Sequence, residues 1–453
     1  MMVEQVDVVV VGLGVAGEEV AGKLAEAGLS VVGVEGRLVG GECPYWGCIP
    51  SKMMIRAANL LAEGRRIPGM SGDSQLTPDW SPVAKRIREE ATDTWDDTVA
   101  VERLEGKGAR FVRGWGQLVG PGRVRVAEQE FQARRAVVVG TGTEPVIPPI
   151  DGLAGTPYWT NRHAIEADRL PASMIVLGGG AIGLELAQAY ARFGTAVTVV
   201  EALDRLIGIE EPEASDLAAE SLRADGVTIR TGAKANRADH QDGFRLALEG
   251  GGAVTGETLL VSVGRRVNLG SLGLDSVGLD PRARALSVDD RMRAGERLWA
   301  VGDVTGHGAF THLAMYQAGI AVRDILGEDG PPADYRAVPR VTFTDPEIGA
   351  VGLTESQARE AGQRVRTGTA QVPSTARGWI HKAGNDGFIK LVVDADSGVL
   401  VGATSAGPTG GEVLSALALA VHARVPVATL RHMIYAYPTF HRGIEDALRD
   451  LAE

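Results

Sequence analysis

The only two cysteines among the 453 residues stand close together near the N-terminus. Cys43 and Cys48 are separated by four residues and are followed by the run Ile-Pro-Ser-Lys. A pair with this spacing closes a disulfide only where the first helical turn is distorted or one cysteine precedes the helix, and Pro44 and Gly47 favour such a backbone. A thiol at a helix N-terminus is held more easily as the reactive thiolate, and Lys52 adds positive charge one turn later. The stretch therefore predicts a redox-active pair, and the alternative is two buried structural cysteines.

A glycine-rich turn precedes the cysteines. Residues 6–11 form an apolar, β-branched run typical of a buried parallel strand, a helical pattern follows through Leu29, and residues 30–34 predict a second strand. The glycines of the turn after the first strand permit a tight turn, the approach of a pyrophosphate and close helix–strand packing. The acidic residue that ends the second strand can accept hydrogen bonds from a ribose. The residues of this dinucleotide fingerprint are Gly12, Gly14, Gly17 and Glu35.

The same order of elements recurs later in the chain. Residues 174–177 predict a strand, a helix extends to Phe193, and residues 196–200 predict the next strand. The repeat carries Gly178, Gly180, Gly183 and Glu201. Two such units can hold two dinucleotides. Glu201 is expected to accept from a ribose 2′-OH and to repel a 2′-phosphate, which favours NADH, whereas the nearby Arg205 would soften that preference. The alternative for Glu201 is a solvated acid at a strand end.

Together with the sequence around the cysteines, these features resemble those of a known enzyme family. The run from Gly40 to Lys52, Gly-Gly-Glu-Cys-Pro-Tyr-Trp-Gly-Cys-Ile-Pro-Ser-Lys, resembles the redox motif of the flavoprotein disulfide reductases, the family of dihydrolipoamide dehydrogenase, glutathione reductase and mercuric reductase. Residues 44–47 differ from the usual Leu-Asn-Val-Gly, and Glu42 stands where Thr is usual. The resemblance extends along essentially the whole chain.

The resemblance implies an α/β fold with two Rossmann-like dinucleotide-binding domains and a C-terminal α+β dimerisation domain. The expected divisions are a first part of the FAD-binding domain at 1–150, an NAD(P)-binding domain at 151–266, a second part of the FAD-binding domain at 267–337 and the dimerisation domain at 338–453. The implied cofactors are FAD and NAD, with NADP as the alternative. The implied assembly is a homodimer with active sites shared between subunits.

The resemblance also implies roles for individual residues. Lys52 is expected to pair with Glu185 beneath the flavin ring and to direct a cation toward flavin N5. Cys48 is expected nearer the flavin and Cys43 nearer the substrate, where it performs thiol–disulfide interchange. Asp303 is expected to hold the ribityl chain, with a helix N-cap as the alternative role. Further cofactor contacts are implied for Gly41, Thr141, Gly142 and Gly264.

The C-terminal part departs from the family pattern. Members that reduce small disulfides carry His-Pro-Thr-x-x-Glu there, and the histidine is the acid/base for the interchange thiol. Here Tyr437 occupies the histidine position and Arg442 the glutamate position. A phenol with an ordinary pKa of about 10 is a poor base near neutral pH. His441 is the candidate substitute, with Glu445 to orient it, and the alternative is that His441 is an ordinary helix residue.

The sequence thus predicts an FAD enzyme that passes electrons from NADH through the Cys43–Cys48 disulfide to a disulfide substrate. Lipoamide, glutathione and mercuric ion are disfavoured because the expected histidine and additional cysteines are missing. The rivals are a diaphorase-like reductase of quinones, dyes or metal ions, which Trp46 and Tyr437 favour, and a non-catalytic redox-sensing subunit.

Bulk properties narrow the class further. The formal net charge of −12 disfavours nucleic acid and anionic membranes as partners, and no apolar run approaches the roughly 18 residues of a membrane span. We expect a cytoplasmic protein with no metal site, because a lone close-spaced cysteine pair is typical of a catalytic dithiol in a reducing compartment. Elsewhere the patterns predict a loop at 64–82, one long surface helix at 83–105, antiparallel strands within 107–134 and helices at 354–362 and 410–423.

Overall fold

The computed structural model describes residues 3–451, which divide into two compact units. The first unit takes in the described residues up to Pro50, then Lys85–Val146 and Arg265–Tyr335. The second takes in Ser51–Ala84, Ile147–Gly264 and the described residues from Arg336 onward. Each unit contains a glycine-rich turn between a strand and a helix.

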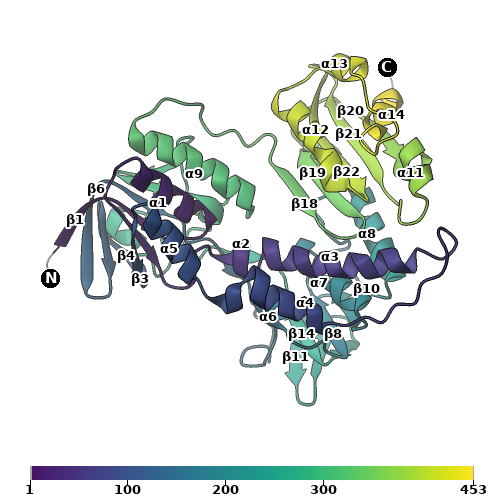
Figure 1. Ribbon diagram of the computed structural model, residues 1–453, viewed down its shortest axis with the longest axis horizontal. Helices are drawn as coiled ribbons and strands as arrows, with labels where there is room; N and C mark the ends of the chain where they lie inside the picture. Colours follow the sequence, from purple (N-terminus) through teal and green to yellow (C-terminus); the bar gives the residue numbers. More distant parts are fainter. Residues whose placement is uncertain (1–2, 452–453) are drawn as a thin grey trace. The chain divides into compact units, whose positions relative to one another are not determined.

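The first unit is built on a mostly parallel sheet (Figure 1). Its strands run in the order β16-β17-β6-β1-β2-β3, and β4 and β5 extend it as an antiparallel hairpin paired with β6. The strands are β1 (Val3–Val11), β2 (Val31–Glu35), β3 (Arg110–Arg113), β4 (Gly116–Gly120), β5 (Arg123–Val126), β6 (Gln129–Val139), β16 (Arg293–Gly295) and β17 (Leu298–Ala300), with a separate short pair β7 (Glu144–Pro145) and β15 (Arg265–Arg266).

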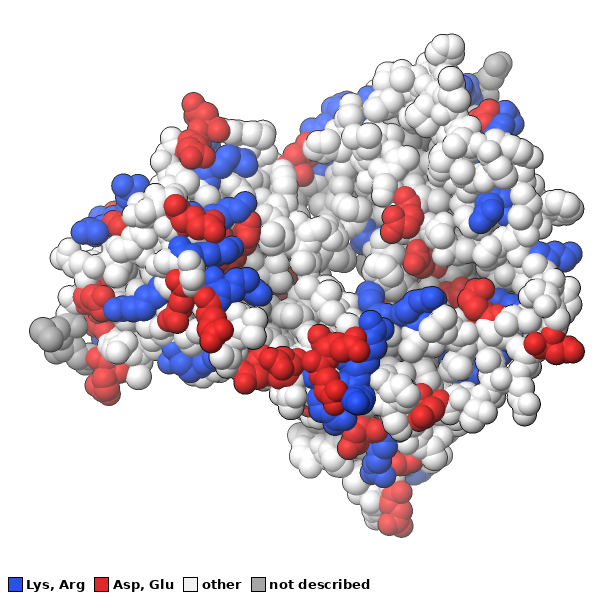
Figure 2. Space-filling model, in the orientation of Figure 1, with Lys and Arg blue, Asp and Glu red and all other residues white. Residues whose placement is uncertain are grey.

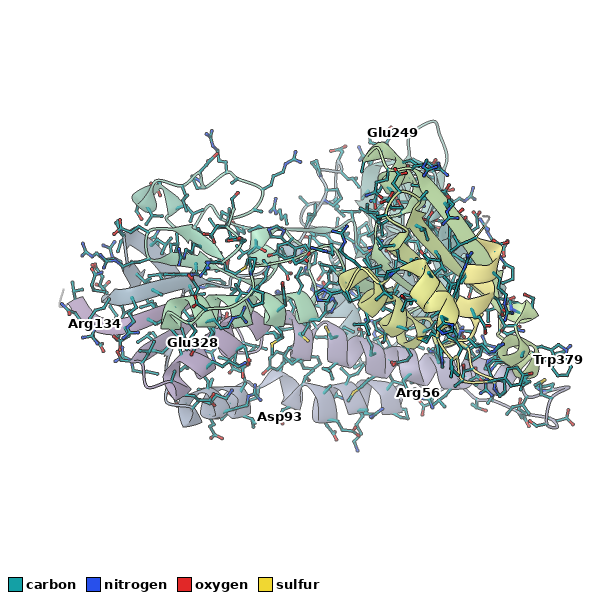
Figure 3. All side chains as sticks on the ribbon, turned by 90° about the horizontal axis from the view of Figure 1, so that it is seen from above. Arg56, Asp93, Arg134, Glu249, Glu328 and Trp379 are labelled. Carbon is teal, nitrogen blue, oxygen red and sulfur yellow. The ribbon has the colours of Figure 1, made fainter. Side chains whose placement is uncertain are left out.

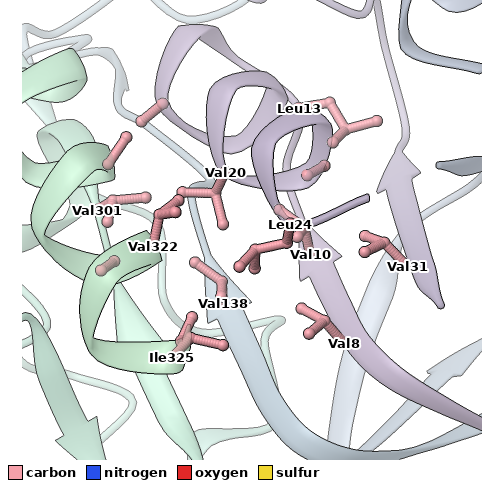
Figure 4. Close-up of a cluster of buried hydrophobic side chains, with 14 of the residues drawn as sticks. Val8, Val10, Leu13, Val20, Leu24, Val31, Val138, Val301, Val322 and Ile325 are labelled. Carbon is pink, nitrogen blue, oxygen red and sulfur yellow. The ribbon is translucent and has the colours of Figure 1, made fainter. Parts of the chain in front are cut away.

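Helices cover one face of this sheet. They are α1 (Val15–Glu26), α5 (Thr98–Gly106) and α9 (Thr311–Leu326), and Figure 4 shows α1 and α9 closing over the sheet. Val8 and Val10 of β1 point into this cluster, whereas Val9 and Val11 point into the opposite cluster, where the β4–β5 hairpin packs. This alternation is the period-2 pattern of a strand buried on both faces, which is why residues 8–11 of β1 form a continuous apolar run.

Short segments complete the first unit. They are α2 (Glu42–Tyr45), the π-helical turn η1 (Ile87–Ala91), and the 3₁₀ turns η2 (Asp93–Trp95), η3 (Leu274–Val277) and η4 (Gly302–Thr305). Two helices include residues of both units: α3 (Cys48–Arg65) begins in the first, and α4 (Ser81–Arg86) ends in it.

The second unit contains a parallel sheet in the order β10-β9-β8-β14 and an antiparallel sheet in the order β18-β19-β22-β21-β20. The first sheet comprises β8 (Ser173–Leu177), β9 (Ala196–Val200), β10 (Thr228–Arg230) and β14 (Thr258–Val261), with α6 (Asn161–Glu166), α7 (Ala181–Arg192), α8 (Pro212–Ala224) and a small meander of β11 (Ala235–His240), β12 (Phe244–Leu248) and β13 (Ala253–Gly256). The second comprises β18 (Pro339–Thr342), β19 (Glu347–Gly352), β20 (Val365–Gln371), β21 (Phe388–Asp394) and β22 (Val399–Gly407), with α10 (Glu355–Glu360), η5 (Val372–Ser374), α11 (Ala376–His381), α12 (Gly410–His422), α13 (Val427–His432) and α14 (Gly443–Asp450).

These elements confirm the predicted fold class, a mixed α/β chain with parallel dinucleotide-binding sheets and a C-terminal α+β part. Among residues 3–451, no helix combines the length and apolar character needed to cross a membrane.

The prediction of one long helix at 83–105 is wrong. The chain turns through η1 and η2 between α4 and α5, and three consecutive residues, Asp93, Thr94 and Trp95, have positive φ angles of 47°, 58° and 57°. Left-handed backbone cannot continue a right-handed helix. The sequence pattern missed the break because apolar spacing continues across it.

The prediction that residues 107–134 form only antiparallel strands is also wrong at its start. β3 pairs in parallel with β2, whereas β4, β5 and the start of β6 are antiparallel as expected. The expected loop at 64–82 begins slightly late, because α3 continues to Arg65, and α4 starts at Ser81.

Candidate active site

The redox pair lies on a short helix and at the start of the longer helix that follows it, in the first unit. Cys43 is in α2, and Cys48 is the first residue of α3. Gly41, which precedes α2, has φ of 68°, and a Cβ there would stand 2.9 Å from Gly14 Cα. The irregular backbone expected between the cysteines is present, since the helix breaks at Trp46 and restarts at Cys48.

Both cysteines are free thiols, and they interact with each other and with Thr311. A hydrogen bond with Cys48, followed by burial, raises the pKa of the Cys43 thiol well above its ordinary value, while Thr311 opposes this shift. The Cys48 sulfur lies 3.2 Å from the Thr311 hydroxyl, at the first residue of α9. The dithiol form is therefore held with its two sulfurs close together.

The first glycine turn has the geometry of a phosphate cradle. A Cβ on Gly12 would stand 2.6 Å from Gly140 O, and one on Gly17 would stand 1.9 Å from Gly12 O. The position of a Cβ on Gly14, in contrast, has no atom within 4 Å. Two of the glycines thus permit close backbone packing and the third leaves open space, as a bound pyrophosphate requires.

The second glycine turn repeats this arrangement. A Cβ on Gly178 would meet Ser262 O at 2.5 Å, one on Gly183 would meet Gly178 O at 2.4 Å, and the position above Gly180 is open. The acidic residue after the second strand of each unit, Glu35 or Glu201, is also held in the same way. Glu35 accepts hydrogen bonds from the backbone N–H groups of Leu13 and Arg37, both at 2.8 Å.

Glu201 accepts the matching pair of bonds in the second unit, from Gly179 at 2.6 Å and Leu203 at 2.7 Å. Each carboxylate is therefore fixed at the mouth of its glycine turn. Arg205 donates to the backbone oxygens of Gly208 and Glu210 and to Ser215. Its guanidinium is thus engaged by its own loop.

Asp303 is part of a polar network in the first unit. Its carboxylate accepts a hydrogen bond from the Thr143 hydroxyl at 2.7 Å, and Arg265 donates to that hydroxyl at 2.9 Å. Burial raises the pKa of the Asp303 carboxyl, against the opposing effects of Thr143 and Arg265. A half-buried acceptor of this kind suits hydroxyl donors of a ligand. Gly142, one residue before Thr143, has φ of 65° and open space above its Cα.

The remaining predicted cofactor residues lie at the ends of strands. Thr141 follows β6, and its Cα lies 2.9 Å from a Cβ built on Gly12. Gly264 follows β14 in the second unit, with φ of 120° and no atom within 4 Å of the position of a Cβ. Thr141 thus lies at a close backbone approach, whereas Gly264 faces open space. Both arrangements fit a bound dinucleotide.

Lys52 and Glu185 form an ion pair in the second unit. The lysine Nζ lies 2.8 Å from a Glu185 oxygen, and only 6% of the Glu185 side chain is exposed. The other Glu185 oxygen accepts from the Phe343 backbone N–H at 2.8 Å, and the Phe343 ring centroid lies 4.5 Å from the lysine Nζ. The ammonium is thus held by a carboxylate and an aromatic ring together.

The segment that carries Phe343 is fixed to α7 and α3. Asp345 donates its backbone N–H to Gln188 at 2.7 Å, and its carboxylate accepts from Arg66 and Arg192, each at 2.7 Å. Arg192 is almost fully buried. This network holds the Phe343 backbone against Glu185.

Tyr437 and His441 lie in the loop before α14, in the second unit. The Tyr437 side chain is 70% exposed, with the Arg442 guanidinium 5.3 Å from its ring centroid. The His441 ring lies 6.3 Å from the Tyr435 ring. Glu445 pairs with Arg442 at 3.0 Å and with Arg449, so the suggestion that it orients His441 is not supported.

Several contact residues were absent from the predicted site. Thr143, Arg265 and Thr311 stand beside predicted residues, and their sequence positions at strand or helix ends were the available signal. Phe343 gave no signal, because its contact with Lys52 joins segments far apart in the chain.

The two glycine turns, their carboxylates and the paired thiols define an oxidoreductase that binds two dinucleotides. Residues 6–318 match the family model described as pyridine nucleotide-disulphide oxidoreductase, and residues 338–448 match the dimerisation domain of that family. The chain therefore belongs to the pyridine nucleotide-disulphide oxidoreductases, a family of enzymes that use FAD and NAD(P)H.

The chain is similar in sequence to proteins with different named activities. It is 33% identical to dihydrolipoyl dehydrogenase of Chlorobaculum tepidum, over 98% of this chain and 97% of that protein. It is 31% identical to mercuric reductase of Shigella flexneri, over 97% of this chain and 79% of that protein.

Two solved structures share the fold over nearly their full length. A Cu(II) complex of the HOCl-induced flavoprotein disulfide reductase RclA from Escherichia coli matches with a TM-score of 0.87 and 27% identity, over 98% of this chain and 99% of that one. LpdA from Mycobacterium tuberculosis matches with a TM-score of 0.86 and 29% identity, over 99% of each chain.

Proposed function

We propose that this enzyme takes electrons from NADH and delivers them through the dithiol of Cys43 and Cys48 to a small disulfide. The observation that carries the proposal is the hydrogen-bonded pair of thiols at the start of α3, with Thr311 beside Cys48. No other cysteine occurs in the chain, so these two sulfurs are the only ones available for interchange.

Interchange proceeds in two displacements. Cys43 gives up its proton to an acid/base group, and its sulfur then attacks one sulfur of the acceptor, forming a mixed disulfide and releasing the first product thiolate. Cys48 then attacks the Cys43 sulfur, which closes the Cys43–Cys48 disulfide and releases the second. Both product thiolates take up protons. The acceptor gains two electrons, the dithiol loses two, and NADH supplies two to restore it.

FAD, when bound, accepts hydride from the nicotinamide and passes the electron pair to the cysteine disulfide. Gly12, Gly14, Gly17, Glu35 and Asp303 are proposed to hold it, with Gly41, Thr141 and Gly142 giving it room. Lys52, held by Glu185, is proposed to place positive charge at the flavin ring.

NADH is proposed as the donor in preference to NADPH. Glu201 is fixed by two backbone N–H groups, so its negative charge stays where a 2′-phosphate would lie, and Arg205 is engaged by its own loop. Gly178, Gly180, Gly183 and Gly264 are proposed to admit the nucleotide.

The variant Glu201→Ala tests this preference. It should lower the ratio of kcat/KM for NADH to kcat/KM for NADPH by about tenfold, since removing the charge repulsion contributes about 1.4 kcal/mol.

The proposed assembly is a homodimer, on the strength of the dimerisation domain at 338–448. Tyr437 or His441 is proposed to serve as the acid/base group of the interchange, in the active site of the partner subunit. The proposed compartment is the cytoplasm, where a reducing environment keeps such a dithiol turning over.

Single cysteine variants test the proposal. NADH-dependent reduction of disulfides should be lost in both Cys43→Ser and Cys48→Ser. Cys43→Ser should retain the long-wavelength absorbance of a thiolate against oxidised flavin, and Cys48→Ser should lack it. If both variants reduce the best acceptor as fast as the wild type, the diaphorase-like alternative, which exposed Tyr437 favours, replaces this function.

A further inference from the structure

A cavity of about 650 Å³ in the first unit opens beside Cys43. Its walls come from α1, from α2 with Cys43, Pro44 and Tyr45, from the segment that joins α4 to α5, and from α5 itself, with one residue of α9. The volume lies within the range of small-molecule sites, roughly 300–1,000 Å³. Because the attacking thiol lines it, the cavity is placed to receive the acceptor.

Acidic side chains outnumber basic ones on its walls. The carboxylates are Glu18, Glu19, Glu89, Glu90, Asp93 and Asp96, and the cations are Arg103 and Lys107. Ion pairs neutralise part of this charge: Glu18 with Arg103, Glu19 with Lys23, Glu89 with Lys85, Glu90 with Arg86, and Lys107 with Glu26.

Asp93 and Asp96 supply the remaining excess. Within residues 3–451 neither forms an ion pair, and both side chains are exposed. The Asp96 carboxylate accepts hydrogen bonds from the backbone N–H and the hydroxyl of Thr98. Figure 3 labels Asp93 at the break between the two helices, and in Figure 2 acidic side chains interspersed with basic ones lie over this part of the first unit. The wall keeps a net negative charge after all pairs are counted.

The backbone of the acidic segment is also unusual. The π-helical turn η1 is followed by left-handed residues Asp93, Thr94 and Trp95. Both conformations cluster at functional sites. The segment is tied to α2, since Trp95 Nε1 donates to Tyr45 O at 3.3 Å and the Tyr45 hydroxyl donates to Asp96 O at 3.5 Å. The strained segment thus holds its two unpaired carboxylates at the cavity wall.

Tyr45 reports the same electrostatic environment. Burial, then the negative charge of Asp97, raises the pKa of Tyr45 to about 12, with Glu18 and Asp96 acting in the same direction and Arg103 opposing them. The phenol therefore stays neutral at physiological pH and adds no charge to the wall.

We propose that this cavity selects a positively charged disulfide, one that carries amine groups a few bonds from its sulfurs. The inference rests on the proposed function, because it needs Cys43 as the attacking thiol. The amines are attracted by the wall, whereas carboxylates on the acceptor are repelled. The bonds formed and broken are those of the two displacements above, with amine-bearing thiols as the products.

Three disulfides with the same two-carbon arms and different end groups test the charge preference. They are cystamine, bearing amines, 2-hydroxyethyl disulfide, which is neutral, and 3,3′-dithiodipropionate, bearing carboxylates. Each kcat/KM with the holoenzyme and NADH is divided by the rate with dithiothreitol at the same pH, because charge alters the intrinsic reactivity of a disulfide. The corrected values should fall in that order, by about threefold or more per step, and added salt should narrow the differences.

Substitutions of the wall carboxylates test whether these groups cause the charge preference. In the double variant Asp93→Asn with Asp96→Asn, the corrected ratio of cystamine to dithiodipropionate should fall by about threefold for each carboxylate removed. Glu89→Gln, on the π-helical turn, provides a second variant should the double variant fold poorly. Glu128→Gln removes an exposed acid of the same unit that is not on the wall, and should leave the ratio unchanged.

Two results would overturn the inference alone: corrected rates that are equal or higher for dithiodipropionate, or a ratio that neither wall variant moves. A third result, in which none of the three disulfides is reduced although NADH still reduces a dye, would overturn the proposed function and this inference with it.

Discussion

At the scale of single residues, the site depends on polar groups whose partners are fixed before any ligand binds. Glu185 is held by the Phe343 backbone N–H and pairs with Lys52, so the ammonium has little freedom to move. Asp303 is held by Thr143 in a half-buried position. Preorganised charges of this kind act on a bound cofactor without the cost of reorientation.

The ring of Phe343 should contribute to the position of Lys52. Phe343→Leu removes the cation–π contact, worth about 0.5–1 kcal/mol, and should lower kcat about two- to fivefold and make the flavin reduction potential more negative. Phe343→Tyr keeps the ring and should restore both values. Anaerobic redox titration and steady-state kinetics measure them, and an unchanged potential in Phe343→Leu would contradict the role.

The raised pKa of Asp303 gives a pH dependence to the flavin-free protein. Folding favours the protonated carboxyl, so its contribution to stability is full below about pH 3.9, the ordinary value for aspartate, and is lost as the pH rises through the raised pKa. Flavin-depleted Asp303→Asn should therefore melt at a higher temperature than wild type at pH 7, and the difference should shrink toward pH 4. Thermal denaturation followed across this range checks the sign.

The same substitution should weaken FAD binding, because the amide replaces a full negative charge as the acceptor of hydroxyl donors. Equilibrium titration of the depleted protein with FAD measures the affinity. An FAD affinity equal to that of the wild type would argue against Asp303 as a cofactor contact.

At the scale of elements, the two strand–turn–helix units repeat the same geometry, which we propose serves two nucleotides. In each, two glycines make close backbone contacts and the middle one faces open space, and the acid after the next strand accepts two backbone N–H groups. Different glycines of the same turn are therefore expected to respond differently to substitution by alanine, depending on whether the added Cβ meets backbone or open space.

Gly180→Ala and Gly183→Ala form a matched pair. The Cβ added at Gly180 meets no protein atom, so the variant should fold and keep its FAD, but should raise the KM for NADH about tenfold or more. The Cβ added at Gly183 would stand 2.4 Å from Gly178 O, so that variant should lose thermal stability. Melting temperature, flavin content and KM together separate the two outcomes; a normal KM in Gly180→Ala would contradict this use of the open space.

At the scale of the whole molecule, the C-terminal part exposes large apolar side chains, some of them in the segment between α13 and α14 that carries Tyr437. Ile434 is 96% exposed, and Met433, Leu419 and Tyr437 are exposed as well. Exposed apolar side chains that gather in one part of a protein commonly mark an interface. These residues fall within the segment that matches the family's dimerisation domain.

Ile434→Glu should therefore disrupt the homodimer. Sedimentation should show the wild type at about twice the 47.6 kDa of the chain and the variant at a lower mass, because burying a charge in an interface is unfavourable. Disulfide reduction should fall with the dimer, while bound FAD is retained. Val3→Glu, at an exposed apolar position of the first unit, serves as the control and should stay dimeric. A dimeric Ile434→Glu would exclude this residue from the interface.

The sequence by itself determined the features that depend on neighbours along the chain. The glycine turns, their flanking strands and the spacing of the cysteines are local patterns, because φ angles, helix starts and strand burial are decided within a few residues. They were sufficient to predict two dinucleotide-binding units and a redox-active cysteine pair, and the resemblance that these motifs carry implied the fold class, the cofactors and the family. The break at Asp93–Trp95 lay outside such reasoning, since left-handed backbone at three non-glycine residues is held by contacts with Tyr45, about 50 positions away.

Only the tertiary structure decided which side chains meet. Phe343 reaches Lys52, Thr311 reaches Cys48, and the carboxylates of α1 and of the segment before α5 share a cavity with Cys43. The physical reason is that packing brings together residues separated by up to several hundred positions, and no periodicity along the chain encodes which of them will touch.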